Sequence, residues 1–119
     1  MTSFVSHTSL DCANAYELST WWKQVLGYID VADDPNEPGH EECLIIAPDD
    51  THRLLFIEVP EGKTVKNRMH LDFHVPDREA EVARLVALGA ARRDTRSEFG
   101  LTWTTLQDPE GNEFCVAQE

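Results

Sequence analysis

Apolar and polar side chains alternate over residues 68–75, Arg-Met-His-Leu-Asp-Phe-His-Val. An alternation with a period of two is typical of a β-strand that is buried on one face only. Leu71, Phe73 and Val75 would then face a core. The opposite face carries three ionisable side chains, His70, Asp72 and His74. Groups of this kind on one strand face need water, a metal ion or a ligand, so the functional prediction starts from this strand.

The residues before this strand predict a strand, a helix and three more strands. The strand patterns cover residues 4–10, 28–32, 42–47 and 53–59. The helix is predicted to begin after Asn14, an N-cap residue with Glu17 three positions later, and to end at Gly27. Residues 33–39 contain two prolines and lack apolar periodicity, which predicts an irregular loop.

The second half of the chain repeats this order. Asp77 is predicted to cap a helix that ends at Gly89, and strands are predicted over residues 90–95, 102–107 and 113–117, with a loop over 96–100. His70 precedes Asp77 by seven residues, as His7 precedes Asn14 by seven. A repeat in register predicts an α+β fold of two βαβββ modules, residues 1–62 and 63–119, within one domain of 119 residues.

The chain is strongly acidic, with 22 Asp and Glu against 10 Lys and Arg, a formal net charge of −12. This charge repels phosphate backbones and anionic membranes, so neither nucleic acid nor membrane is predicted as a partner. It either attracts a cationic small molecule or only keeps the surface solvated. One basic group interrupts the pattern, Lys63, Lys66 and Arg68. It is interpreted as a solvated loop or as a holder for an anionic group of a ligand.

Cys12, Cys43 and Cys115 are odd in number and widely spaced, which favours neither a disulfide framework nor a zinc ribbon. Reduced thiols favour a cytoplasmic setting. The N-terminal residues carry no basic segment followed by an apolar one, and no run approaches the roughly 18 apolar residues of a membrane span. We therefore expect an unsecreted, cytoplasmic protein.

The order of elements and two sequence stretches resemble the vicinal oxygen chelate superfamily. The stretches are Arg-Met-His-Leu-Asp-Phe-His in the central strand and Asp-Pro-Glu-Gly-Asn-Glu-Phe-Cys-Val at residues 108–116. Within the superfamily, the chain is most similar to the small glyoxalase-like proteins grouped with glyoxalase I, bleomycin resistance proteins and extradiol dioxygenases. The resemblance implies curved mixed sheets around a ligand cleft, with helices outside and, in many members, a homodimer that completes the clefts.

In metal-dependent members that resemble glyoxalase I, the first and last strands of each module supply the metal ligands. The matching positions here are His7, Glu58, His70 and Cys115. A glutamate is usual at the fourth position, so Cys115 is a departure, either a thiolate ligand or a small apolar residue of the cleft. These donors suit zinc, nickel, iron, cobalt or manganese, and no organic cofactor is implied.

The remaining candidate residues share these strand faces. The acid–base candidates are Glu58, Asp72 and His74. The candidates for substrate binding are Phe56, Trp103 and Thr105. Among them, Trp103 is a stacking surface for a flat ligand if its strand face lines the cleft, and otherwise a core residue.

Two functions remain open from the sequence, and both have a small molecule as partner. The first is a metal-dependent enzyme with lyase, isomerase or dioxygenase chemistry, in which the ion chelates two substrate oxygens. The second is a metal-free protein of the bleomycin resistance type that sequesters a cationic or aromatic compound. The matched ligand positions favour the enzyme, which is the leading hypothesis. The missing glutamate and the net charge of −12 favour the binding protein.

Overall fold

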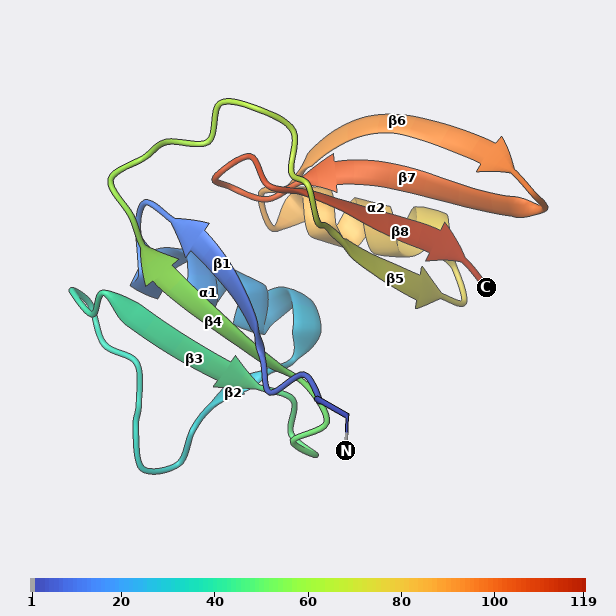
Figure 1. Cartoon of the computed structure of the whole chain (residues 1–119). Helices are drawn as coiled ribbons and strands as arrows, with labels where there is room; N and C mark the ends of the chain where they lie inside the picture. The colour runs from blue at the N-terminus through green and yellow to red at the C-terminus, as the bar shows by residue number, and fades with distance from the viewer. Residues whose placement is uncertain (1) are drawn as a thin grey trace. The chain divides into compact units, whose positions relative to one another are not determined.

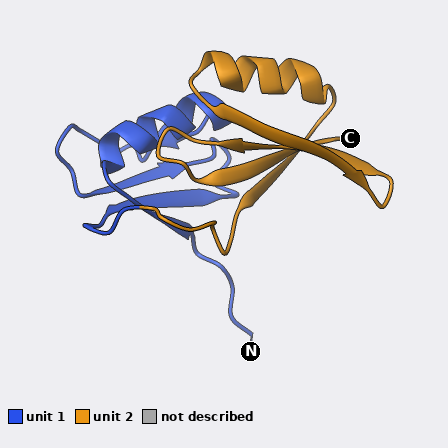
Figure 2. Cartoon of the chain, turned by 90° about the horizontal axis from the view of Figure 1, so that it is seen from above, with its two compact units in different colours: residues 1–62 blue, residues 63–119 orange. Residues whose placement is uncertain are grey.

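The computed structural model describes residues 2–119, which fold into two units of the same type (Figures 1 and 2). The chain divides between residues 62 and 63. Each unit holds one helix and a mixed sheet of four strands, with the elements in the order strand, helix and three strands. This α+β arrangement confirms the predicted repeat of elements. None of the described helices has the length and apolar character needed to cross a membrane.

Unit 1, residues 1–62, contains β1 (Thr8–Cys12), α1 (Ala15–Leu26), β2 (Ile29–Asp30), β3 (Glu42–Ile46) and β4 (Arg53–Glu58). Its sheet has the order β1-β4-β3-β2, with β1 and β4 parallel. β1 begins at Thr8, whereas the sequence pattern predicts a strand from residue 4. Thr8 pairs with Leu54, the second residue of β4, so residues before His7 lie beyond the start of β4 and have no partner on it. Phe4 and Val5 therefore lie outside the sheet and are exposed.

The ends of α1 follow the sequence prediction. The Asn14 side chain accepts a hydrogen bond from the Glu17 backbone N–H at 3.0 Å. Gly27 ends the helix with a φ of 68°, a conformation that glycine adopts without strain. The buried face of α1, which includes Leu18 and Trp22, packs against β3 and β4. The core of unit 1 therefore lies between this helix and one face of the sheet.

Unit 2, residues 63–119, contains β5 (Leu71–Val75), α2 (Arg78–Ala87), β6 (Ala91–Glu98), β7 (Leu101–Gln107) and β8 (Glu113–Gln118). The sheet order is β5-β8-β7-β6, with β5 and β8 parallel. Asp77 caps α2 as predicted, since its side chain accepts a hydrogen bond from Ala80 N–H at 3.1 Å. Val82 and Leu85 of α2 are buried, as are Leu106 and Phe114 of the sheet. The helix thus covers one sheet face.

The connection between β6 and β7 is shorter than predicted. The sequence suggests a loop over residues 96–100, whereas β6 continues to Glu98 and only Phe99 and Gly100 form the turn. Their φ angles are 55° and 75°, as in the two-residue turns that join twisted antiparallel strands. Asn and Gly are the usual residues in such turns, so Phe99 concealed the hairpin in the sequence.

The turn before β8 is organised by Asp108, which is only 4% exposed. Its carboxylate accepts hydrogen bonds at 2.9 Å from the backbone N–H groups of Glu110 and Asn112 and from the Asn112 side chain. Gly111 has a φ of 88°, which favours glycine. The motif at residues 108–112 therefore sets where β8 begins, and with it the position of Cys115 on that strand.

Candidate functional site

The face of the unit 2 sheet opposite α2 carries the candidate site, and we call it the open face. Side chains alternate between the two faces of a strand, so Phe114 and Val116 point to the helix side while Cys115 points to the open face. Asp72 is the register partner of Cys115 in β5, and Thr105 is its partner in β7. Strand pairing thus places a carboxylate, a thiol and a hydroxyl side by side.

The open face lines a pocket with a volume of about 820 Å³. All of its lining residues belong to unit 2. They include six of the residues selected from the sequence, namely His70, Asp72, His74, Trp103, Thr105 and Cys115. The polar face of the central strand therefore points into a hollow large enough for a small molecule.

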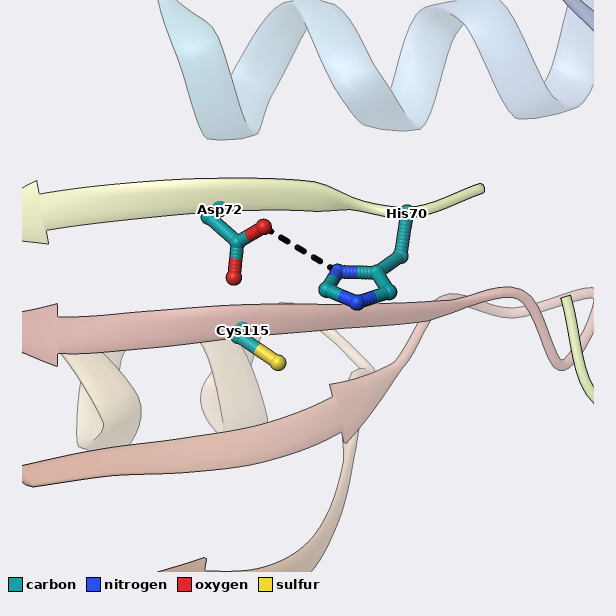
Figure 3. Close-up of side chains that lie close together, drawn as sticks. All are labelled: His70, Asp72 and Cys115. Carbon is teal, nitrogen blue, oxygen red and sulfur yellow. Dashed lines mark ion pairs between the residues drawn. The ribbon is translucent and has the colours of Figure 1, made fainter. Parts of the chain in front are cut away.

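Three of these side chains lie close enough together to hold one metal ion (Figure 3). A ring nitrogen of His70, a carboxylate oxygen of Asp72 and the sulfur of Cys115 all lie within 4.8 Å of one another. His70 Nδ1 is 3.2 Å from Asp72 Oδ2. Within residues 2–119, no other set of three His, Cys, Asp or Glu side chains approaches this closely.

The donor set fits a divalent ion. Zinc bonds of about 2.0–2.3 Å place tetrahedral ligand atoms roughly 3.3–3.8 Å apart, so modest side-chain rotations would bring the three donors into range. Imidazole, carboxylate and thiolate are all zinc ligands, and the thiolate makes the site softer than one with a carboxylate in its place. Three protein ligands leave a position open for water or substrate, as in catalytic sites.

Cys115 is 8% exposed, and burial raises the pKa of its thiol. The Thr105 hydroxyl, 3.6 Å from Sγ, lowers this pKa, as does the positive charge of Lys66, whereas the Asp72 carboxylate raises it further. The net effect is an increase, so the thiol keeps its proton at neutral pH unless an ion displaces it.

The other two predicted ligands, His7 and Glu58, belong to unit 1. Thr8 pairs with Leu54 and Cys12 pairs with Glu58, so His7 lies level with the start of β4 and Glu58 with its end. Five residues of strand correspond to about 16 Å. Glu58 Oε1 accepts a hydrogen bond from Ala15 N–H at 3.4 Å, at the start of α1. Unit 1 therefore separates these two side chains instead of bringing them to one ion.

Phe56, predicted to bind substrate, is 0% exposed in the core of unit 1. Leu54, also on β4, is equally buried, and α1 packs against this strand. A side chain without exposed surface cannot line a cleft, so this prediction is wrong. The sequence placed Phe56 on the correct strand face but did not show that the helix covers that face.

The contribution of β6 to the pocket was not predicted from the sequence. Asp94, Arg96 and Glu98 alternate along this strand and line the pocket with Phe99 of the turn. All residues of β6 are exposed, so the apolar alternation that marks a half-buried strand is absent. The pattern that could have indicated this face is the alternation of the charged residues Asp94, Arg96 and Glu98 with the uncharged Thr95 and Ser97.

Two βαβββ units with mixed sheets and flanking helices define a protein of the vicinal oxygen chelate superfamily, the glyoxalase, bleomycin resistance and dioxygenase group. More narrowly, the chain belongs to the glyoxalase-like domain family, whose model matches residues 7–117. No protein with a curated description matches the sequence.

Solved structures share the fold at low sequence identity. A glyoxalase/bleomycin resistance protein/dioxygenase superfamily member from Sphaerobacter thermophilus is 15% identical, with a TM-score of 0.73 over 99% of this chain and 98% of that one. The fosfomycin resistance protein FosX from Listeria monocytogenes, solved as an E126Q mutant with Mn(II) and 1S,2S-dihydroxypropylphosphonic acid, is 14% identical (TM-score 0.76, 98% and 90% covered). Lactoylglutathione lyase from Agrobacterium tumefaciens is 16% identical (TM-score 0.69, 98% and 94% covered).

Proposed function

We propose that the chain is a metal-dependent glyoxalase-like enzyme that binds a divalent ion and a small oxygen-bearing substrate in the unit 2 pocket. The observation that supports this proposal is the approach of His70, Asp72 and Cys115 ligand atoms to within 4.8 Å. Two similar structures are consistent with it, since one holds Mn(II) and the other is a lyase. Lyase, isomerase or dioxygenase chemistry would suit such a site.

A bound divalent ion would polarise a substrate oxygen and stabilise negative charge that develops on it. The residues of the chain would orient the substrate and move its protons. His74 lies on the same face as Asp72, two residues further along β5, and lines the pocket, so it is our candidate proton acceptor. Asp72 would bind the ion beside His70, and Thr105 would donate a hydrogen bond to the Cys115 sulfur. Glu58, the third acid–base candidate, contacts α1 in unit 1.

Metal analysis tests this proposal. Protein purified without chelators and then loaded separately with Zn²⁺, Mn²⁺ and Ni²⁺ should retain about one ion per chain by mass spectrometry of the metal content. His70→Ala should abolish retention because it removes a ligand. His74→Ala is the matched control, since His74 lines the same pocket from the same strand but lies outside the close group of donors. Equal losses in both variants, or no retention of any ion, would contradict the proposal.

A metal-free binding protein is the second candidate. His70 and Asp72 already satisfy each other at 3.2 Å, and burial keeps the Cys115 thiol protonated, so the pocket is stable without an ion. In this case the pocket would bind a ligand with equal affinity before and after treatment with a chelator. A loss of binding on chelation that zinc restores would exclude this candidate.

We further propose that the protein acts in the cytoplasm as a homodimer. Cys12, Cys43 and Cys115 are free thiols, which suits a reducing compartment. Met69, Val65 and Phe99 of unit 2 are exposed large apolar side chains, and a subunit interface would cover such residues. Light scattering coupled to size-exclusion chromatography would show a dimer mass, and a monomer mass at micromolar concentration would contradict the proposal.

A further inference from the structure

The three basic residues Lys63, Lys66 and Arg68 have different surroundings in the structure. Residues 63–67, which we call the strap, lead into β5. The Lys63 ammonium lies 3.1 Å from Glu113 Oε1 and donates to the Val65 carbonyl at 2.6 Å. Lys66 instead lines the pocket. No carboxylate among the described residues lies within 4.0 Å of the Lys66 ammonium.

The strap is fixed to β8, so the position of Lys66 is built into the fold. Glu113 N–H donates to Asn67 Oδ1 at 2.9 Å, and Asn67 N–H donates to Glu113 Oε2 at 3.2 Å. Although burial opposes it, hydrogen bonds from Asn67 and Lys63 hold the pKa of Glu113 below its usual value. The anchor is therefore ionised at neutral pH. Lys66 lies between two anchored residues, Lys63 and Asn67.

Two of the other charged residues of the pocket form an ion pair, since Arg96 Nε lies 2.7 Å from Asp94 Oδ2. Asp72 Oδ2 lies 3.2 Å from His70 Nδ1, and Glu98 lines the pocket from the turn end of β6, four residues from Asp94. The hydrogen bond from Arg96 is the main cause of the lowered pKa of Asp94 on β6, and the Lys66 charge adds to it, so Lys66 lies near this strand. Lys66 is thus a pocket cation without an ion-pair partner within 4.0 Å among residues 2–119, in the same pocket as His70, Asp72 and Cys115.

Trp103 provides a flat apolar surface in the same pocket. It is half-buried, and its register partners are Ala117 on β8 and Arg96 on β6. Ala117 has a small side chain, and Trp103 lines the pocket with part of its surface exposed. Thr105, the next open-face residue of β7, lies beside Cys115, so Trp103 is one open-face position away from the Cys115 thiol along the sheet.

We propose that the pocket takes a small organic anion, whose anionic group pairs with Lys66 and whose flat apolar part lies against Trp103. This inference rests on the proposed function, because it assigns a ligand class to the same pocket. It differs from the expectation of a cationic ligand drawn from the net charge of −12. The net charge describes the whole chain, whereas the anionic group of a ligand is recognised by the cation beside it in the pocket, Lys66.

Benzoate is the probe. Acetate carries the same carboxylate group without the ring, and benzylammonium carries the ring with a positive charge. Binding is measured by NMR chemical-shift titration of the full chain at constant ionic strength, without metal and after loading with zinc. We expect benzoate to bind more tightly than acetate, and benzylammonium not to shift the pocket resonances. Trp103→Leu should remove the advantage of benzoate over acetate.

Two matched variants test the role of Lys66. Lys66→Gln should weaken benzoate binding about tenfold, the effect of a lost charge-assisted hydrogen bond. Arg68→Gln removes the same charge from an exposed residue outside the pocket lining, and should change the affinity by less than about twofold. Lys66→Arg should retain most of the binding, since it keeps the charge.

Equal affinities of Lys66→Gln and Arg68→Gln for benzoate, or preferential binding of benzylammonium, would overturn the inference. Its failure is distinguishable from failure of the proposed function. If zinc does not bind but benzoate binding still depends on Lys66, the metal proposal fails and the ligand class stands. If zinc binds but Lys66→Gln and Arg68→Gln bind benzoate with equal affinity, the ligand class fails and the metal proposal stands.

Discussion

Asp72 and Cys115 are direct partners in the parallel pairing of β5 and β8. The pairing sets a carboxylate beside a buried thiol, an arrangement that opposes thiolate formation unless a cation lies between them. His70, the residue before β5, has its Nδ1 3.2 Å from Asp72, so this strand pair and the residue that precedes it supply all three candidate ligands.

Replacing the sulfur should change which metal the site prefers. Cys115→Glu substitutes a hard carboxylate for a soft thiolate, so the ratio of zinc to manganese affinity should fall by at least about tenfold. Competition titrations with both ions would measure this ratio. Thr105→Val, which keeps the sulfur but removes its hydrogen-bond partner, is the control and should alter the ratio far less. An unchanged ratio in Cys115→Glu would show that residue 115 does not bind the ion.

Asp108→Ala should destabilise the protein by about 2–3 kcal/mol, because it leaves the N–H groups of Glu110 and Asn112 without their acceptor in a part-buried turn. Urea denaturation would measure the loss. Asp49→Ala is the matched control, since Asp49 also accepts a bond from a nearby N–H, that of Thr51, but in an exposed turn. A loss no larger than that of Asp49→Ala would contradict the account of this turn.

Phe99→Asn should stabilise the β6–β7 hairpin by about 0.5–1 kcal/mol, because Asn tolerates a positive φ better than Phe does. Phe99 has a φ of 55° and is fully exposed, so little packing is lost. The free energy of unfolding in urea would report the gain. Phe99→Ala, which does not favour this conformation, should bring no such gain. A loss of stability in Phe99→Asn would show that the phenyl ring makes contacts that stabilise the hairpin.

Asp30 should make the stability of unit 1 depend on pH in the acidic range. Burial opposes it, but hydrogen bonds from Lys23 at 3.0 Å and Asn36 at 2.7 Å lower the pKa of Asp30 below 3.8. The folded state therefore holds this proton less tightly than the unfolded state. The resulting stabilisation is present above about pH 4 and is lost as pH falls through the lower, folded pKa.

Urea denaturation between pH 7 and pH 3 tests this dependence. Asp30→Asn should be less stable than the parent protein at pH 7, and the difference should shrink toward pH 3. A difference that stays constant over this range would show that the carboxylate charge of Asp30 does not contribute.

Local features allowed much of the fold to be predicted. Asn14, Gly27 and Asp77 mark helix ends through their own backbone preferences and hydrogen bonds to neighbours in sequence. The alternation in the central strand is also local, and it placed Asp72 and His74 on the face that the structure shows to line the pocket. Where local preference misled, as at Phe99, the turn depends on strand pairing that overrides it.

The order of elements, the repeat and the side chains that share a strand face could all be predicted from the chain alone, because they depend on residues a few positions apart. Which faces are covered and which strands are neighbours depend on the folded chain. The fold buries Phe56 beneath α1, separates His7 from Glu58 along one strand pair, and brings Asp72 beside Cys115. The register between strands forty or more residues apart depends on long-range pairing and packing. No local sequence pattern predicts it.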